Sequence, residues 1–449
     1  MTLCKMKWVT LLILLVAAIA HVAANGQSQQ PGSAKSITLT FGNFWTPDAK
    51  GNKDYHTALV SAWMKQHAGV KVQLETYGST YFTQVAPTWL ASNTWPNGFI
   101  INTDLLRTAV KSNQLMDWTQ VLNADPTWKD SFLSGILKNE DVVGGKYWGV
   151  PNAFITNQLF FYNKSILAKA GYRQFPRTWG DMLTMLAKLK RMGYVPIAMW
   201  DTQGGWPVVA YFLEPLVQFV CGTQWVDEIG SFSASASYTN PCFVRALSMI
   251  DNLAQKGYFN KDFLSANYGD NSGLYGSGKA ATLIDGTWMV GTLIQTVPKD
   301  VIAETEVAPL PRPSDSSPNV PYGMFTGGAG WAYSGRADLS GAKKQDLVSL
   351  VKYLTGPAQV SAGLKHYDIP PTKLPPSLNT SELPRLEIST MKVYGSAPAI
   401  YPMNEEQNGP TMPNVLYRDL QSMLAGSTTP EETAHEIEAA YNRLVVAKE

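Results

Sequence analysis

The chain has 449 residues, of which 45% are hydrophobic and only 16% are charged. This composition is typical of a well-packed globular protein, long enough for two domains, and it excludes a long disordered arm. With 36 basic and 35 acidic residues, the formal net charge is +1. Bulk charge therefore attracts the chain neither to nucleic acid nor to an anionic membrane, and we expect neither as a partner.

The first predicted element is a targeting segment, a signal peptide at residues 1–24. Lys5 and Lys7 precede an apolar run at residues 8–20, and small residues offer a cleavage site after Ala24. The run is shorter than the roughly 20 residues that a helix needs to span a bilayer, which favours a signal peptide over an anchor. We therefore expect a soluble periplasmic protein.

The mature chain begins with a strand, a helix and a second strand. Residues 37–44 alternate apolar and polar side chains, residues 54–67 show helical spacing, and residues 70–75 alternate again. Two strands joined through a helix predict a parallel crossover unit. A third short strand at residues 99–101 ends in polar residues, and open α/β sheets bind ligands at the carboxyl ends of their strands.

Further strands and helices alternate through the middle of the chain. An amphipathic helix follows the N-capping residue Thr178, and residues 193–197 lead into another strand. Residues 201–213 begin as a polar, Gly-rich loop and then enter a helix. Residues 278–293 predict a strand, an Asp-Gly turn and a helix that carries Trp288.

The last third of the chain contains a predicted crossing and two clear helices. The Pro-rich residues 307–316 indicate a chain crossing or linker. A helix is expected over residues 343–354, where it ends before a Gly-Pro pair. The final helix begins after Thr429, with Pro430 at its first position.

Cys221 and Cys242 are the two cysteines that follow the predicted cleavage site. A pair of cysteines in an exported protein suggests a disulfide, and two buried free thiols are the alternative. Together with the four histidines of the mature chain they show no metal-ligand spacing. We therefore expect no metal site and no cofactor.

Residues 273–280 have the spacing of a phosphate-binding loop. The position after Lys279 holds Ser or Thr in such loops, where its hydroxyl binds magnesium, but here it is Ala280. No apolar strand precedes the segment. We therefore expect a turn before a strand and no nucleotide site.

Catalytic pairs of carboxylates are harder to exclude from the sequence. Glycosidases use two Asp or Glu side chains about 5–10 Å apart. The candidates are Asp104, Asp201, Glu214 and Asp285. The chain has no nucleophile-elbow sequence and few histidines, which disfavours Ser–His–Asp chemistry. A secreted glycoside hydrolase or lyase is therefore kept as the alternative to a binding protein.

Aromatic side chains beside predicted turns are the positive signal for ligand binding. Their flat faces can stack on the apolar C–H faces of sugar rings, while carboxylates such as Asp104 and Asp285 bind the hydroxyls. A single aromatic residue is more often part of the core, but the placement of this group in loops favours a site. The candidates are Trp45, Tyr81, Trp206, Trp288, Trp331 and Tyr401.

Four segments, taken in order, resemble the extracellular solute-binding proteins of ABC sugar importers, the maltose-binding-protein-like family 1. Residues 145–190 run from an aromatic, Gly/Pro-punctuated stretch into a buried strand, a Tyr-Asn-Lys sequence and an amphipathic helix. The others are a Lys-Ala-Ala segment that ends in Gly-x-Trp (275–293), a late helix with a Gly-Pro-Ala-Gln turn (347–363), and a terminal Thr-Pro-Glu-Glu helix (423–444). Together with the first strand, the similarity covers nearly all of residues 36–449.

The resemblance implies an α/β fold of the type II periplasmic-binding-protein class, with two lobes joined by a hinge. The first lobe would comprise residues 36–150 and 308–365. The second lobe would comprise residues 151–307 and 366–449. The hinge would lie near Val150-Pro151 and Val307-Ala308.

The resemblance also implies a function without catalysis. A sugar would bind in the cleft between the lobes, and the closed protein, expected to be a monomer, would deliver it to an inner-membrane ABC permease. The same fold with a polyamine, an iron complex or a phosphate ester is a further alternative. Maltose itself is not expected, because the position that supplies a Glu in maltose-binding protein falls near Thr156 and Asn157. The cleft positions by similarity are Trp45, Asp104, Thr156 or Asn157, Trp206, Trp288 and Tyr401.

Overall fold

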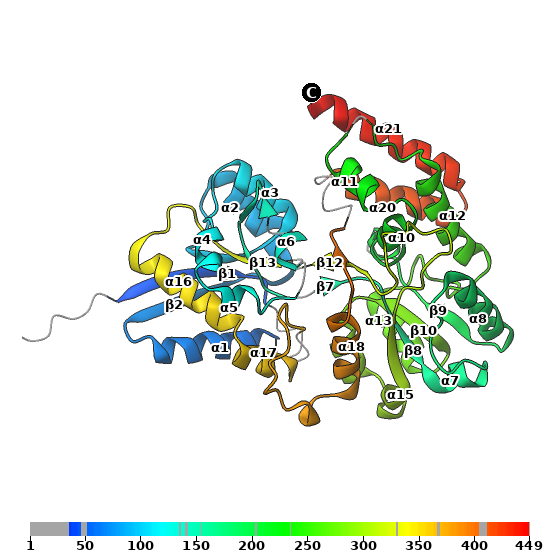
Figure 1. Cartoon of the computed structure of the whole chain (residues 1–449), viewed down its shortest axis with the longest axis horizontal. Coiled ribbons are helices and arrows are strands. Elements are labelled where there is room, and N and C mark those ends of the chain that lie inside the picture. Colours follow the sequence, from blue (N-terminus) through cyan, green and yellow to red (C-terminus); the bar gives the residue numbers. More distant parts are fainter. Residues whose placement is uncertain are drawn as a thin grey trace, which may run out of the picture. The chain divides into compact units, whose positions relative to one another are not determined.

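The computed structural model describes residues 36–45, 52–133, 136–139, 142–153, 155–202, 204–233, 235–328, 331–365, 369–403 and 411–448. The predicted signal peptide, residues 1–24, lies outside the described residues. The described strands form two larger sheets and two smaller ones, and helices flank both larger sheets (Figure 1). This is the α/β class that the sequence predicts.

The first larger sheet has the strand order β2–β1–β3–β13–β6. Strand β1 (Ile37–Asn43) pairs in parallel with β2 (Val70–Thr76) and with β3 (Gly98–Asn102). Strand β13 (Trp331–Gly335) comes from much later in the chain and pairs antiparallel with both β3 and β6 (Val150–Pro151). The sheet is therefore built from two distant parts of the sequence.

Helix α1 (Asn52–Gln66) connects β1 to β2 and confirms the predicted parallel crossover. Helix α16 (Gly341–Leu354), which the sequence also predicts, packs against α1 and β1 through Leu347 and Leu350, both fully buried (Figure 1). The remaining elements around this sheet are short: η1 (Gly78–Thr80), η2 (Tyr81–Val85), α2 (Ala86–Ser92), α3 (Thr103–Lys111), α4 (Thr119–Asn123), α5 (Pro126–Lys129), α6 (Ile136–Asn139), β4 (Val142–Val143), β5 (Lys146–Tyr147) and α17 (Pro357–Leu364).

The second larger sheet has the strand order β11–β8–β10–β9. The central strands β8 (Leu159–Asn163) and β10 (Ala280–Asp285) pair antiparallel and are buried along their whole length. Strand β9 (Val195–Ala198) pairs in parallel with β10, and β11 (Thr305–Pro309) pairs antiparallel with β8. Burial on both faces explains why β8 and β10 read as continuous apolar runs without alternation.

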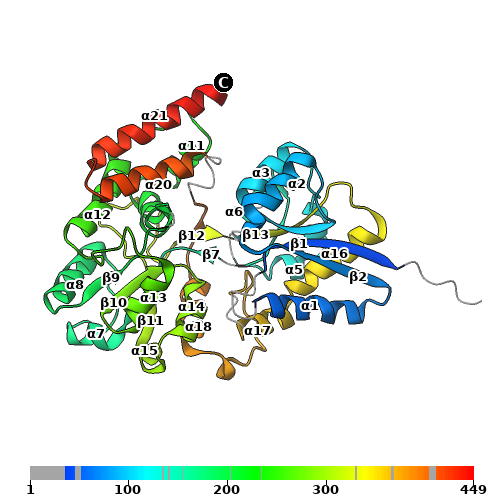
Figure 2. The ribbon, with the colours of Figure 1, turned by 180° about the vertical axis from the view of Figure 1, so that it is seen from behind.

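The helices of this half carry the caps that the sequence predicts. Thr178 accepts a hydrogen bond from the Asp181 N–H (3.2 Å) at the start of α8 (Trp179–Arg191). Helices α20 (Thr411–Leu424) and α21 (Pro430–Lys448) pack against each other and against α12 (Pro241–Gln255) (Figure 2). The other helices are α7 (Lys164–Lys169), α9 (Trp206–Val208), η3 (Val209–Leu213), α10 (Glu214–Val220), α11 (Thr223–Gly230), α13 (Tyr268–Gly276), α14 (Met289–Thr296), α15 (Lys299–Glu304), η4 (Thr380–Glu382) and α18 (Arg385–Gly395).

A small sheet with the order β14–β12–β7 lies on the segments that connect the two larger sheets. Strand β7 (Ile155–Thr156) lies between β6 and β8 in the chain, and β12 (Phe325–Gly328) precedes β13. Strand β14 (Ile400–Tyr401) pairs in parallel with β12. The chain therefore passes between the two sheets at β7 and at β12.

The second of these crossings lies later in the chain than the hinge position near Val307-Ala308. Val307 and Ala308 lie inside β11, where they pair with Phe161 and Phe160 of β8. Leu310, Val320 and Met324 are then buried in the same core as α8 and α12. The Pro-rich residues 307–316 thus run along the second half of the fold, because their apolar side chains still complete its core.

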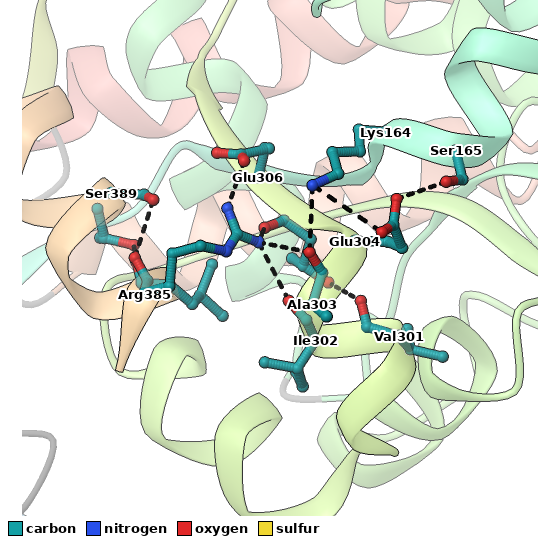
Figure 3. A network of polar contacts seen from close by, with 12 residues as sticks. Lys164, Ser165, Val301, Ile302, Ala303, Glu304, Glu306, Arg385 and Ser389 are labelled. Carbon is teal, nitrogen blue, oxygen red and sulfur yellow. Dashed lines mark hydrogen bonds and ion pairs between the residues drawn. The ribbon is translucent and has the colours of Figure 1, made fainter. Parts of the chain in front are cut away.

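Arg385, the first residue of α18, fastens the chain to the second half after it leaves α17. Its guanidinium donates to the carbonyl oxygens of Ala303 (2.9 Å) and Thr305 (2.6 Å) and forms an ion pair with Glu306 (Figure 3). The end of α15 leaves backbone carbonyl groups without helical partners, and a cation there satisfies them and complements the helix dipole. This side chain therefore joins α18 to α15 and β11.

Cys221 and Cys242 form a disulfide between the end of α10 and the start of α12, which confirms the predicted pair. The bond closes a loop between positions 21 residues apart. A loop of this length restricts the unfolded chain by about 3 kcal/mol in the chain-entropy description. We expect the Cys221→Ala, Cys242→Ala double variant to lose about that much free energy of unfolding. Guanidinium denaturation of the oxidised wild type and the variant measures it, and equal midpoints would contradict the expectation.

Among the described residues, none of the helices combines the length and the apolar character needed to cross a bilayer.

Candidate functional site

Two partly exposed tryptophans lie together where loops leave the second sheet. Trp206 opens α9 in the loop after β9, and Trp288 lies directly before α14, after the carboxyl end of β10. Their ring centroids are 6.0 Å apart and their planes are tilted by 35°. A third ring inserted between two rings needs about 7–8 Å, given carbon contacts of 3.5–4.0 Å. Trp206 and Trp288, which we call the indole pair, therefore form one continuous aromatic surface and not a clamp.

Two glycines, Gly205 and Gly286, allow the two tryptophans to pack closely against the backbone. Gly205 has a φ of +94°, and a Cβ atom there would lie 2.3 Å from the carbonyl oxygen of Tyr417 in α20. At Gly286 a Cβ atom would lie 2.1 Å from the Trp288 ring. Because Gly205 lacks a side chain, the loop with Trp206 can approach α20. Because Gly286 lacks one, the Trp288 ring can pack on the backbone.

Asp285 lies behind the indole pair and is fully buried. Its carboxylate accepts hydrogen bonds from the Tyr211 hydroxyl (2.8 Å), the Trp200 indole N–H (3.0 Å) and the backbone N–H of Gly286 (2.8 Å). Burial raises the pKa of Asp285 to about 6, although these hydrogen bonds act in the opposite direction. Asp285 is a predicted ligand contact, but because it is fully buried it supports the loop behind the two tryptophans.

Asp201 holds the loop that carries Trp206. It is fully buried and accepts hydrogen bonds from the Val208 N–H (3.2 Å) and from the Gln421 side chain (3.2 Å). The carboxylate thus caps the segment that begins at Trp206 and ties it to α20. Burial raises the pKa of Asp201 to about 7, and the two hydrogen bonds lower it only in part.

The raised pKa of Asp201 predicts a specific dependence of stability on pH. The folded chain binds this proton more tightly than the unfolded chain, where the pKa of Asp is about 3.9. The contribution of Asp201 to stability is therefore complete below about pH 4 and is lost as the pH rises through about 7. We expect the free energy of unfolding of the wild type, minus that of Asp201→Asn, to fall between pH 4 and pH 8. Urea denaturation of both proteins across this range measures the difference, and a constant value would contradict the expectation.

A second aromatic cluster lies at the first sheet. Phe44 follows β1, Phe82 lies in η2, and Trp331 begins β13, and all three are partly exposed. The ring centroids of Phe44 and Trp331 are 4.5 Å apart, and the Phe82 and Trp331 rings stack at 6.0 Å. We call Phe44, Phe82 and Trp331 the aromatic triplet. It is a second aromatic surface beside the carboxyl end of a strand, with Phe44 tilted by 53° against Trp331.

A pocket adjoins the aromatic triplet, with an empty volume of about 620 Å³ that is partly open to solvent. Among the residues that line it are Trp45, His56, Asn152, Thr355 and Pro370. Trp45 is only 1% exposed and stacks on the His56 ring, with centroids 4.5 Å apart. Within the described residues, the buried indole N–H of Trp45 and the buried side-chain nitrogen of Asn152 have no hydrogen-bond acceptor. Two residues with an unpaired buried nitrogen thus border a pocket that otherwise has mainly apolar walls.

The other predicted positions lie in the core or on the crossings. Tyr81 is fully buried and donates its hydroxyl hydrogen bond to the Ile100 carbonyl (2.7 Å). Thr156 and Asn157 are buried on the first crossing, where the Thr156 hydroxyl donates to the Thr326 carbonyl (3.0 Å). Tyr401 is partly exposed in β14. The side chain of Asp104, in α3, lies outside the described residues.

Phe44 and Phe82 are absent from the predicted site, although the sequence contains a signal for Phe44. Phe41 and Trp45 are both buried, and a strand alternates its side chains between two faces. Extending this alternation from Phe41 assigns Trp45 to the buried face and Phe44 to the opposite one. Phe82 has no such signal, because its exposure beside the buried Tyr81 depends on how η2 packs.

No group of three or more His, Cys, Asp or Glu side chains with the arrangement of a metal site occurs in the part of the chain that the structure describes.

The chain is similar to several proteins whose names describe them as binding proteins. The chain is 26% identical to the uncharacterized ABC transporter extracellular-binding protein PH1039 of Pyrococcus horikoshii, over 34% of this chain and 36% of that protein. It is 23% identical to the diacetylchitobiose binding protein DasA of Streptomyces coelicolor over 95% of both chains. A solved structure named chitin oligosaccharide binding protein superposes with a TM-score of 0.78 at 21% identity, covering 92% of this chain and all of that one.

The structural similarity shows that the fold is the two-lobed type II periplasmic-binding-protein fold that the sequence predicts. Residues 49–361, more than half of the chain, match the sequence profile of the bacterial extracellular solute-binding proteins. The chain belongs to this family of bacterial extracellular solute-binding proteins.

Proposed function

We propose that the protein captures a sugar or oligosaccharide in the periplasm and delivers it, as a monomer, to an inner-membrane ABC permease. Membership of a solute-binding family supports a binding role. Two similar proteins carry names that specify chitin-derived ligands, diacetylchitobiose and chitin oligosaccharide. The predicted signal peptide supports export through the cytoplasmic membrane.

The indole pair is the observation that carries this proposal. The rings of Trp206 and Trp288, with centroids 6.0 Å apart and each packed against a glycine, form a partly exposed apolar surface. Large aromatic surfaces left open to solvent are costly unless a ligand or partner covers them. The apolar faces of pyranose rings match such a surface, and the aromatic triplet offers a second one.

The burial of the candidate carboxylates favours binding over hydrolysis. A glycosidase needs an acid and a second carboxylate that both reach the scissile bond. Asp201 and Asp285 are fully buried and Glu214 is 1% exposed. These three side chains therefore cannot contact a substrate without a rearrangement of the core.

The side chains around the pocket favour an uncharged ligand. Among the described residues, those that line it include no Asp, Glu, Lys or Arg. A polyamine site needs carboxylates, and a phosphate site needs cations or clustered backbone donors. A neutral sugar requires neither.

Closure of the two lobes is the proposed mechanism. We place the lobe boundaries at the crossings β7 and β12, so that residues 157–324 fall in the second lobe. A sugar that contacts both lobes only in the closed state shifts the population toward closure, as in other periplasmic binding proteins. A shift from 1:99 to 99:1 needs about 5.5 kcal/mol of differential affinity. Stacking on two aromatic surfaces together with buried hydrogen bonds can supply this energy.

A panel of neutral mono- and oligosaccharides tests the proposal. We expect at least one sugar to raise the melting temperature, because a ligand that binds only the folded chain stabilises it. Titration calorimetry and tryptophan fluorescence then give the affinity, and chromatography of the recovered sugar tests for turnover. Binding without product supports the proposal. Release of shorter sugars would establish an enzyme, and a response only to polyamines or phosphate esters would refute the sugar.

One matched pair of disaccharides makes the test sharper. Cellobiose and diacetylchitobiose share their linkage and differ at the 2-position, where the latter carries acetamido groups. The acetamido methyl groups add apolar area that the walls of the pocket can cover. We expect diacetylchitobiose to bind more tightly. Equal affinities for the two sugars would contradict this assignment of the pocket.

A further inference from the structure

Asp285 accepts hydrogen bonds from several elements of the second lobe, whereas a residue that only caps one turn would bind a single segment. Its first carboxylate oxygen accepts from the Tyr211 hydroxyl in η3 and from the Gly286 N–H after β10, both at 2.8 Å. Its second oxygen accepts from the Trp200 indole at 3.0 Å and from the Asn271 side chain in α13 at 3.3 Å. Four donors from four places in the chain therefore converge on one fully buried carboxylate.

Two of these four donors lead directly to the indole pair. The Tyr211 ring lies edge-on to the Trp206 ring, with centroids 5.7 Å apart and planes at 76°. Gly286, the other donor on the same oxygen, lies beneath the Trp288 ring. One carboxylate oxygen of Asp285 therefore binds both Tyr211, which contacts Trp206, and Gly286, which lies beneath Trp288.

The electrostatics of the site make this connection rigid. An ionised carboxylate forms stronger hydrogen bonds than a neutral acceptor, and low polarity in the interior strengthens them further. Removing the acceptor would leave up to four buried donors without a partner, which a folded chain avoids by rearranging. The rearrangement would involve Tyr211 and the Gly286 turn, and hence both tryptophans.

We propose that Asp285 is a positioning residue, which fixes the angle between Trp206 and Trp288 through Tyr211 and Gly286 and so sets which sugars the indole pair accepts. The inference rests on the proposed sugar-binding function. Asp285 itself does not contact the ligand. A disaccharide that covers both rings depends on their angle, whereas a monosaccharide on one ring depends on it much less.

Tyr211→Phe and Asp285→Asn test the proposal, and Tyr275→Phe is the matched control. Tyr275 is also buried in the second lobe, and its hydroxyl pairs with that of Thr305 at 2.9 Å, away from the indole pair. Each Tyr→Phe variant thus removes one buried hydroxyl group of the same kind. Tyr211→Phe also keeps the ring that supports Trp206, so it remains informative if Asp285→Asn does not fold.

The first readout is circular dichroism of the ligand-free proteins in the long-wavelength indole band, where tyrosine does not absorb and which reports the coupling of two indoles at this separation. We expect Tyr211→Phe, Asp285→Asn and Trp206→Phe all to change this band, and Tyr275→Phe to leave it unchanged. The second readout is affinity for the best disaccharide of the panel. We expect a loss of tenfold or more for the two test variants, a smaller loss for a monosaccharide, and none for the control.

The outcomes separate this inference from the proposed function. Folded test variants with the dichroism and the affinity of Tyr275→Phe would overturn the positioning role. An equal loss for mono- and disaccharides would also overturn it, because such a loss indicates general damage. If the wild type binds no carbohydrate, the proposed function fails, and the dichroism of the ligand-free variants still decides whether Asp285 positions the indole pair.

Discussion

Replacing Trp288 by alanine is expected to weaken sugar binding at least tenfold, while the fold is kept. The indole is partly exposed and lies on Gly286, so its removal takes away half of the indole pair. A tenfold loss corresponds to about 1.4 kcal/mol, which is modest for the contact area of one indole face. Titration calorimetry with the best sugar of the panel measures the change.

Two further variants serve as controls for the loss of affinity in Trp288→Ala. Trp288→Phe keeps a flat ring over Gly286 and is expected to retain part of the affinity. Tyr194→Ala removes another partly exposed aromatic side chain, at the opposite, amino end of β9, and is expected to bind as the wild type does. If Trp288→Ala binds with unchanged affinity, Trp288 does not belong to the site.

Replacing Gly205 by alanine is expected to lower the free energy of unfolding by about 4 kcal/mol. The residue has a φ of +94°, which costs an L-residue with a side chain about 1–2 kcal/mol. Its new Cβ would also lie 2.3 Å from the Tyr417 carbonyl oxygen, and backbone of a packed helix cannot move aside as a flexible side chain can. Overpacking of this kind adds about 1–3 kcal/mol. Urea denaturation measures the loss.

Gly204→Ala is the matched control, one residue earlier in the same loop. Gly204 also has a positive φ, of +69°, but no atom lies within 4 Å of a Cβ built there. We therefore expect only the conformational cost, about 1–2 kcal/mol. Similar losses for the two variants would show that the approach of α20 does not limit this loop. A loss of sugar affinity in Gly205→Ala, beyond that in Gly204→Ala, would further indicate that α20 holds Trp206 in place.

The sequence was sufficient to predict the elements that are encoded by neighbouring residues. Alternation over residues 37–44 and 70–75 predicts β1 and β2, and the intervening helical spacing predicts α1. Thr178 and Thr429 mark the helix starts that the structure has, because a cap is formed within one turn of chain. Cys221 and Cys242 were identified as a pair for a similar reason, since only two cysteines remain after the signal segment.

The candidate site was predictable only in part. Trp206 and Trp288 were predictable as aromatic residues beside predicted turns. The same criterion selects Trp45 and Tyr81, and both are buried. Loop position does not determine exposure, because the elements that cover a loop come from elsewhere in the chain. For Tyr81, carbonyl groups of β1 and β3 accept its hydroxyl and hold it in the core.

The sequence by itself determined the class of fold, the strands and helices with a clear periodic pattern, two helix caps and the disulfide, because each depends on neighbouring residues or on a pair with no competitor. Tertiary structure alone decided where the chain crosses between the sheets, which aromatic side chains reach the surface and what Asp285 does. Val307 and Ala308 read as a linker but pair with β8, and Asp285 accepts from Trp200, Tyr211 and Asn271 as well as from the adjacent Gly286. Except for Gly286, these contacts join residues that are far apart in the sequence, and no local pattern encodes which of them will meet.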